Sequence, residues 1–94
     1  MRISTYTIAF APRTEKQLAI IPKAIRQQIF DRIDKLKKNP RPENIEPLHG
    51  SDSGLFRIRQ GDYRIVYSIQ DKLLLVLIVR VVHRKEVYKK KHTS

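Results

Sequence analysis

The stretch FRIRQGDYRIVY, residues 56–67, decides the fold, because two runs of alternating side chains flank a short polar turn. Apolar residues and arginines alternate in both runs, a pattern typical of two strands joined in a hairpin. A two-residue turn at Gly61-Asp62 puts glycine at the first central position, where a tight hairpin favours it. The resulting register sets Arg59 directly opposite Arg64.

The hairpin has two faces, because successive side chains of a strand point to opposite sides of the sheet. The apolar face, which we expect to meet the helices, holds Phe56, Ile58, Ile65 and Tyr67. The other face, called the arginine face below, holds Arg57, Arg59, Arg64 and Val66. Like charges opposed across strands destabilise a sheet. The arginines therefore either pair with Asp52, Asp62 or Asp71 or splay into water, or they bind phosphate together, for which bidentate guanidinium groups are well suited.

The whole chain predicts one α+β domain over residues 1–94, with the element order β-α-α-β-β-β. The expected elements are a strand at 3–10, helices at 13–20 and 22–38, a short strand near 45–48, and strands at 54–60, 62–69 and 72–82. An apolar stripe on the second helix consists of Ile25, Ile29, Ile33 and Leu36. We expect an antiparallel sheet with the helical hairpin packed on one face. The last strand, apolar at almost every position, is predicted to be central and covered on both faces.

Charge is the strongest global feature, since the chain carries a net +11 and has a pI near 10.4. Such a surface attracts a polyanion such as nucleic acid, and an acidic protein would use the same surface. The chain has no cysteine, which excludes disulfides and thiolate metal sites. Its histidines are too scattered for a metal site, and no cofactor motif is present, so we expect neither metal nor cofactor. The N-terminus lacks a secretory signal and no apolar run is long enough to cross a bilayer, so we expect a cytoplasmic protein.

Several segments resemble the RelE/ParE toxin superfamily. They are LFRIR and GDYRIVY within residues 55–67, HRKEVY at 83–88, and the helical segment 21–29. The resemblance covers essentially the whole chain and implies a toxin neutralised by a small antitoxin encoded beside it. RelE-like members are ribosome-dependent endoribonucleases, whereas ParE-like members poison DNA gyrase.

The resemblance also implies roles for particular residues. Arg64 corresponds to the catalytic arginine of RelE-type toxins, and Arg57 and Arg59 match two basic positions on the strand before the turn. Tyr88 matches a C-terminal tyrosine that some members require, and the pair His83-Arg84 matches further catalytic or phosphate-binding groups.

Other cations extend this set on the sequence alone. Arg80 interrupts the last apolar strand, so it either joins the arginine face or extends from the edge of the sheet into solvent. Lys89 and Lys90 belong to a basic tail that we expect to attract phosphate.

These residues suit metal-independent cleavage of mRNA, in which the 2′-OH attacks the adjacent phosphate. The arginines would stabilise charge on the phosphorane, and we expect His83 and Tyr88 beside the arginine face. Histidine is the only residue type among the candidates whose unperturbed pKa lies near neutrality, and Tyr88 would stack on a base or transfer a proton. Structural alternatives stay open, because His83 would otherwise be a surface residue and Tyr88 would pin the tail to the sheet. We expect an mRNA endoribonuclease acting in the ribosomal decoding site and a hetero-oligomer with an acidic antitoxin. The alternatives are a gyrase inhibitor that acts by binding and an RNA-binding module without enzymatic activity.

Overall fold

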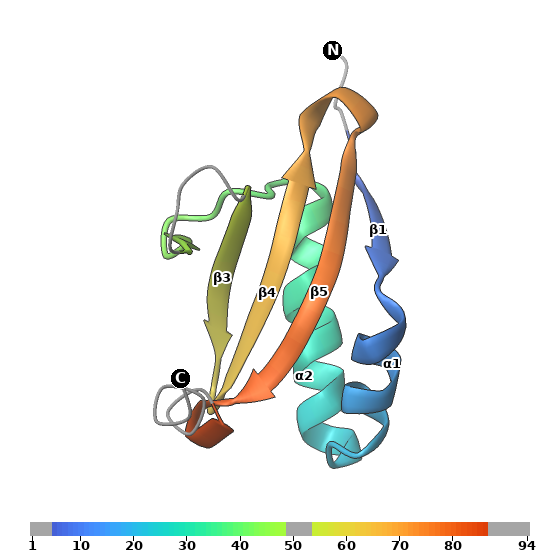
Figure 1. Cartoon of the computed structure of the whole chain (residues 1–94), viewed down its shortest axis with the longest axis vertical. Helices are drawn as coiled ribbons and strands as arrows, with labels where there is room; N and C mark the ends of the chain where they lie inside the picture. Colours follow the sequence, from blue (N-terminus) through green and yellow to red (C-terminus); the bar gives the residue numbers. More distant parts are fainter. Residues whose placement is uncertain (1–4, 49–53, 87–94) are drawn as a thin grey trace.

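The computed structural model describes residues 5–48 and 54–86, which form a five-stranded sheet flanked by two α-helices (Figure 1). The strands are β1 (Thr7–Phe10), β2 (Glu46–Pro47), β3 (Leu55–Gln60), β4 (Tyr63–Gln70) and β5 (Leu75–His83). The helices are α1 (Pro12–Ala19) and α2 (Lys23–Asp34), with 3-10 turns η1 (Lys35–Lys37) and η3 (Asp71–Leu73). Among these residues, no helix is long and apolar enough to cross a membrane.

The sheet has the strand order β1-β5-β4-β3-β2, which confirms the predicted α+β fold. Strands β2 to β5 pair antiparallel with their neighbours, but β1 runs parallel to β5. The expectation of a purely antiparallel sheet is therefore wrong at this one edge. Helix α1 continues in the direction of β1, and α2 runs back along the sheet (Figure 1). Strand β3 therefore runs in the direction of β1, and the two reversals at β3–β4 and β4–β5 leave β5 parallel to β1.

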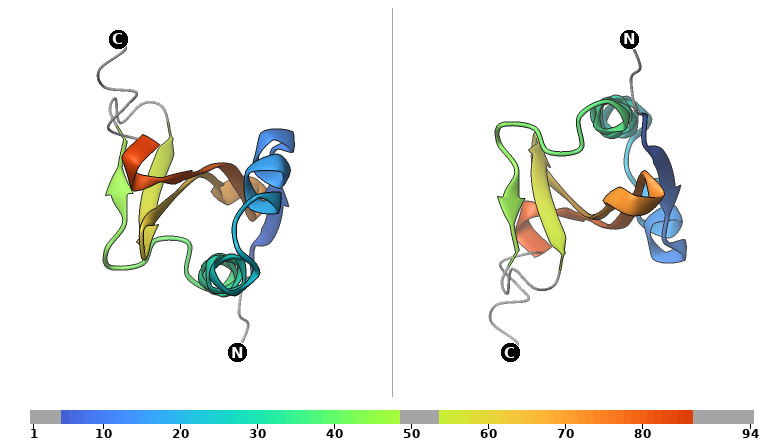
Figure 2. Two further views of the ribbon diagram at one scale, coloured as in Figure 1. Left: turned by 90° about the horizontal axis from the view of Figure 1, so that it is seen from below. Right: turned by 90° about the horizontal axis from the view of Figure 1, so that it is seen from above.

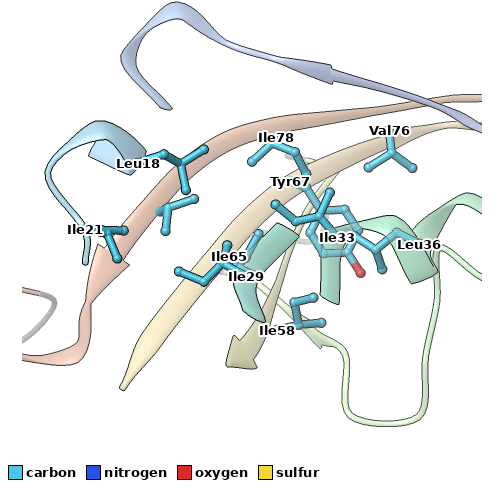
Figure 3. Close-up of a cluster of buried hydrophobic side chains, with 11 residues drawn as sticks. Leu18, Ile21, Ile29, Ile33, Leu36, Ile58, Ile65, Tyr67, Val76 and Ile78 are labelled. Carbon is cyan, nitrogen blue, oxygen red and sulfur yellow. The ribbon is translucent and has the colours of Figure 1, made fainter. Parts of the chain in front are cut away.

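Helix α2 covers one face of the sheet, and the core lies between them (Figures 2 and 3). From the helix come Ile29 and Ile33, followed by Leu36 of η1, and all three are buried. Facing them across the core are Ile58, Ile65, Tyr67, Val76 and Ile78. Ile25 was expected to share this stripe, but 37 % of it is exposed. Near this end of α2, Leu18 and Ile21 from the preceding helix and loop join the core.

Helix α1 lies along the edge of β5, beyond the point where β1 ends (Figure 1). The Ala11 N–H donates to the Ile78 carbonyl at 2.9 Å, the last backbone bond on this edge before the helix. Further along, the Gln17 side-chain oxygen accepts a hydrogen bond from the Val81 N–H at 2.8 Å. A helix side chain thus satisfies a β5 donor that has no strand beside it.

Strand β5 lies between β1 and β4, as expected of an interior strand, but only one of its faces is fully covered. Val76, Ile78 and Val81 are buried on the α2 side, whereas Leu75 and Leu77 are only partly buried. The expectation of cover on both faces is therefore wrong. Neither α1 nor α2 lies on the second face (Figure 2), which belongs to the same side of the sheet as the hairpin arginines.

A charged cluster ties the chain together at the end of the sheet near η3. Arg41 donates two hydrogen bonds to Asp71, from Nη1 to Oδ1 at 3.1 Å and from Nη2 to Oδ2 at 2.9 Å. The Tyr6 hydroxyl donates to the same Asp71 Oδ1 at 2.6 Å. Hydrogen bonds from Arg41 and then Tyr6 lower the pKa of Asp71 to about 2. The Arg41 guanidinium also lies 5.9 Å from the centre of the Phe56 ring.

Candidate functional site

The hairpin of β3 and β4 has the predicted register. Gln60 pairs with Tyr63, Arg59 with Arg64, and Arg57 with Val66. Gly61 adopts a φ of 60° at the first central position of the turn, a conformation that glycine tolerates and most residues avoid. The sequence pattern therefore predicts both the turn and the face on which each arginine lies.

Strand β5 extends the arginine face by two positions. Val82 pairs with Arg64, and Arg80 pairs with Val66. Between Val66 and Tyr67 the register shifts by a β-bulge, which leaves Val79 as the extra residue of β5. The bulge brings Arg80 onto the arginine face while Ile78 still faces the core. Of the two alternatives for Arg80, the structure therefore selects the one that joins the other arginines.

Strand β2 adds a carboxylate to this face. Glu46 pairs with Arg57, and its Oε1 accepts hydrogen bonds from Arg57 Nε at 3.1 Å and Nη2 at 2.9 Å. Its other oxygen, Oε2, lies 4.0 Å from Arg59 Nη2. Sequence reasoning missed Glu46, because residues 49–53 separate the short strand from the hairpin and hide its register. The only available signal was the predicted short strand near 45–48.

Two of the three carboxylates considered as alternative partners for the hairpin arginines have other contacts. Asp71 binds Arg41 instead. Asp62 lies beside Arg84, with its Oδ1 3.8 Å from Arg84 Nε and its carbonyl accepting from the Arg84 N–H at 2.7 Å. Asp52 lies outside the described residues. The alternative in which Asp62 or Asp71 pairs with the hairpin arginines is therefore not the arrangement found, because the register of β2 makes Glu46 the neighbour of Arg57 and Arg59.

Arg64 is anchored at the hairpin turn. Its Nη1 donates to the carbonyl of Gly61 at 3.3 Å and to the carbonyl of Tyr63 at 3.2 Å. The turn carbonyls thus orient the guanidinium at the end of the arginine face, close to where Arg84 follows β5. Arg64 is partly buried, whereas Arg59, opposite it, is exposed.

His83 lies on the opposite side of the sheet from the arginines. It pairs with Tyr63, and strand alternation places both residues on the same face of the sheet as the buried pair Ile65 and Val81. The His83 and Tyr63 rings meet edge to face, with 5.1 Å between their centres. His83 also lines a small cavity of about 130 Å³ together with residues of α1 and the following turn, among them Gln17 and Ile21. The expectation that His83 lies beside the arginine face is wrong, because the strand alternation that directs the arginines outward directs His83 inward.

The bonding of His83 fixes its tautomer. Its Nδ1 accepts a hydrogen bond from the Lys85 N–H at 3.1 Å. A neutral imidazole whose Nδ1 is an acceptor carries its proton on Nε2. In this tautomer the ring lone pair that could accept a proton is on Nδ1, where the Lys85 N–H already engages it. The catalytic role of His83 stays a prediction.

The other sequence candidates lie outside the described residues. Tyr88, Lys89 and Lys90 belong to residues 87–94, and His49 and His92 also fall in the undescribed stretches. Within 5–48 and 54–86, no group of three histidine or carboxylate side chains is placed to hold a metal ion.

The arginine face concentrates positive charge on a rigid support. Among the described residues it holds four guanidinium groups, those of Arg57, Arg59, Arg64 and Arg80. The same face holds one carboxylate, that of Glu46. Guanidinium groups bind phosphate oxygens through paired N–H donors and remain protonated at any physiological pH. The arrangement can therefore bind a phosphodiester and stabilise extra negative charge as it develops.

The sequence matches a known protein family over most of its length. The model of the family described as "ParE toxin of type II toxin-antitoxin system, parDE" matches residues 8–88. Toxin RelG of Mycobacterium tuberculosis is 30 % identical over 86 residues, which cover 90 % of this chain and 98 % of RelG.

Solved structures share the fold. The toxin–antitoxin complex RelBE2 of M. tuberculosis contains a chain that is 30 % identical with a TM-score of 0.77, covering 88 % of this chain and 95 % of that one. The archaeal RelE–RelB complex of Pyrococcus horikoshii gives 30 % identity and a TM-score of 0.75, covering 85 % and 96 %. The isolated E. coli RelE toxin gives 25 % identity and a TM-score of 0.73, covering 94 % and 96 %.

Proposed function

We propose that this chain, which belongs to the RelE/ParE superfamily of toxins from type II toxin–antitoxin systems, is an endoribonuclease that cleaves messenger RNA on the ribosome. The observation that carries the proposal is the arginine face. It sets Arg59 directly against Arg64, and the carboxylate of Glu46 lies 4.0 Å from Arg59. A sheet built for stability alone gains nothing from that opposition. A phosphodiester bound between the strands would turn the repulsion into attraction.

In the proposed reaction the 2′-OH of one nucleotide attacks the adjacent phosphate, forming a 2′,3′-cyclic phosphate and expelling the 5′-oxygen of the next nucleotide. Arg64 lies at the turn and is oriented by two carbonyls, so we assign it the largest share of phosphorane stabilisation. Arg57 and Arg59 hold the nonbridging oxygens from the neighbouring strand. Arg80 and Arg84, with Lys89 and Lys90 of the tail, hold flanking phosphates.

Proton transfer is assigned to His83 and Tyr88, with one adjustment drawn from the structure. His83 is the last residue of β5, so RNA on the arginine face reaches it only around the end of the sheet. We therefore assign His83 a smaller part in the proton transfer than Tyr88. Tyr88 is the stronger candidate by its match to the superfamily.

A partner protein follows from the same charges. The RelE chains of the P. horikoshii and M. tuberculosis complexes were solved with their antitoxins. We propose that this chain also forms a hetero-oligomer in the cytoplasm with a cognate antitoxin, an acidic protein whose carboxylates cover the arginine face. An amphipathic antitoxin helix would suit the basic surface, and the complex should loosen as salt rises. A basic neutralising protein whose binding ignores salt would contradict this assignment.

One observation favours a second function. The family whose model matches residues 8–88 carries the ParE name, and inhibition of DNA gyrase by binding is the function that the superfamily resemblance implies for ParE-like members. A gyrase inhibitor needs the basic surface but no group positioned on a phosphodiester.

Induction of the protein in growing cells separates these functions. We expect new mRNA 5′ ends within coding regions soon after induction, with no early induction of the DNA-damage response. Intact mRNA with an early DNA-damage response would identify a gyrase poison. Intact mRNA without DNA damage, with the protein bound to RNA, would identify a non-enzymatic RNA-binding module.

A further inference from the structure

Glu46 occupies a distinct position among the arginines. It comes from β2, a strand of only two residues, and it sits in the same cross-strand row as Arg57, Val66 and Arg80. One of its oxygens accepts two hydrogen bonds from Arg57, at 3.1 and 2.9 Å. The other points toward Arg59, 4.0 Å away. The carboxylate therefore bridges the two arginines that β3 contributes to the face.

This contact restricts Arg57 more than its neighbour. The Arg57 side chain is 29 % exposed and the Glu46 side chain 42 %, whereas that of Arg59 is 64 % exposed. Two donors on one edge of the Arg57 guanidinium, Nε–H and an Nη2–H, are engaged by a single oxygen. The remaining donors of that planar group are consequently held in one direction. An arginine without such a partner would lose several rotatable bonds of freedom on binding phosphate.

We propose that Glu46 is a positioning residue for RNA cleavage, which holds the Arg57 guanidinium in place before the phosphate binds. This inference rests on the proposed nuclease function. Glu46 touches the arginines and acts through them, by keeping their donors oriented before substrate arrives.

The test compares two substitutions that separate orientation from charge. In Glu46→Gln the side-chain oxygen still accepts both hydrogen bonds from Arg57, whereas in Glu46→Ala nothing accepts them. Glu43→Ala is the matched control, because it removes one negative charge from an exposed side chain shortly before β2. No hydrogen bond or ion pair joins Glu43 to an arginine of this face within the described residues. The measurement is single-turnover cleavage of mRNA on programmed ribosomes, with ribosome binding measured separately.

We expect Glu46→Ala to lower the cleavage rate constant about 10-fold while ribosome binding changes by less than about twofold. Glu46→Gln should keep most of the wild-type rate, and Glu43→Ala should match wild type. A Glu46→Ala protein that cleaves as fast as wild type would overturn the proposal. So would a Glu46→Gln protein as slow as Glu46→Ala, because the charge or proton affinity of Glu46 would then matter and the orientation of Arg57 would not.

A second readout does not depend on cleavage. NMR of the Arg57 Nε–H group should show an ordered, slowly exchanging proton in wild type and Glu46→Gln, and a mobile one in Glu46→Ala. An unchanged Arg57 signal in Glu46→Ala would show that Glu46 does not order the Arg57 guanidinium. A wild-type protein that leaves mRNA intact overturns the proposed nuclease function, and the NMR comparison still decides whether Glu46 orders Arg57.

Discussion

Two of the arginine–carboxylate clusters in the described part of the chain differ in how their charges balance. At the η3 end, one arginine meets one carboxylate through two parallel hydrogen bonds, and the Tyr6 hydroxyl adds a third. On the arginine face, Glu46 is shared by Arg57 and Arg59, while Arg64 bonds to turn carbonyls. For Arg80, no ion-pair partner occurs in the described part of the chain. The first cluster is electrically complete and the second carries excess positive charge.

This difference in charge balance indicates different roles for the two clusters. The Arg41–Asp71 cluster joins segments far apart in the chain, from before β1, before β2 and after β4, so its role is to stabilise the fold. The arginine face instead keeps like charges close together on strands that are already paired by backbone bonds. An excess of oriented donors on a rigid sheet is the arrangement expected of a site that binds an anionic ligand.

Replacing one arginine from each cluster should give the largest contrast. Arg64→Ala should leave the fold intact and lower the rate of mRNA cleavage by about 10²–10³-fold, because it removes a cation from the developing phosphorane. Arg41→Ala should cleave at nearly the wild-type rate but unfold at a lower temperature. Growth arrest on induction and single-turnover cleavage in vitro provide the measurements. A folded Arg64→Ala protein that arrests growth as well as wild type would remove Arg64 from the site.

His83 should contribute less than the arginines, because its side chain points to the α2 side of the sheet. We expect His83→Gln, which keeps hydrogen bonding and loses titration, to lower the single-turnover rate by less than about 10-fold. The pH–rate profiles of wild type and His83→Gln should then have the same inflections. A loss of about 10²-fold or more, with an inflection of the wild type that the variant lacks, would show that RNA reaches around the end of the sheet to His83.

The smallest effect on activity is expected at Asp71. The pKa of this carboxyl is about 2, below its usual value of 3.8, so the folded state favours the ionised form. Its stabilising contribution should be fully present above about pH 4 and should disappear as pH falls toward about 2. Asp71→Asn should therefore lower the unfolding temperature near neutral pH, and the difference from wild type should shrink on acidification, with cleavage unchanged. If Asp71→Asn lowered the unfolding temperature by the same amount at every pH tested, the Arg41–Asp71 pair would not be the source of the difference.

The hairpin and helices could be predicted from sequence because their signals are local. Alternation around Gly61-Asp62 gives the register of β3 and β4, and the spacing of Ile29, Ile33 and Leu36 gives the buried side of α2. The parallel pairing of β1 with β5 joins segments some 70 residues apart, and no local pattern records it. The bulge that places Arg80 on the arginine face cannot be predicted from the sequence either, because one extra apolar residue in an apolar run leaves the hydrophobic pattern unchanged.

The candidate site was predicted in part for the same reason. The faces of Arg57, Arg59 and Arg64 follow from strand alternation, which is a local rule. Glu46 was missed because its register depends on β2, a strand too short to show alternation. His83 was assigned to the wrong side because resemblance to a motif supplies neighbours along the chain, whereas its actual neighbour across the strands is Tyr63.

The central claim is that the arginine face stabilises a phosphate under attack by the RNA's own 2′-OH. The most direct measurement is single-turnover cleavage on programmed ribosomes of two mRNAs, identical except that one carries a 2′-deoxy sugar at the cut site. We predict that the wild-type protein converts the all-ribose message to products ending in 2′,3′-cyclic phosphate and 5′-hydroxyl, and leaves the 2′-deoxy message uncut at that position. Normal cleavage of the 2′-deoxy message would show that another group attacks the phosphate, and it would contradict the mechanism assigned to the arginine face.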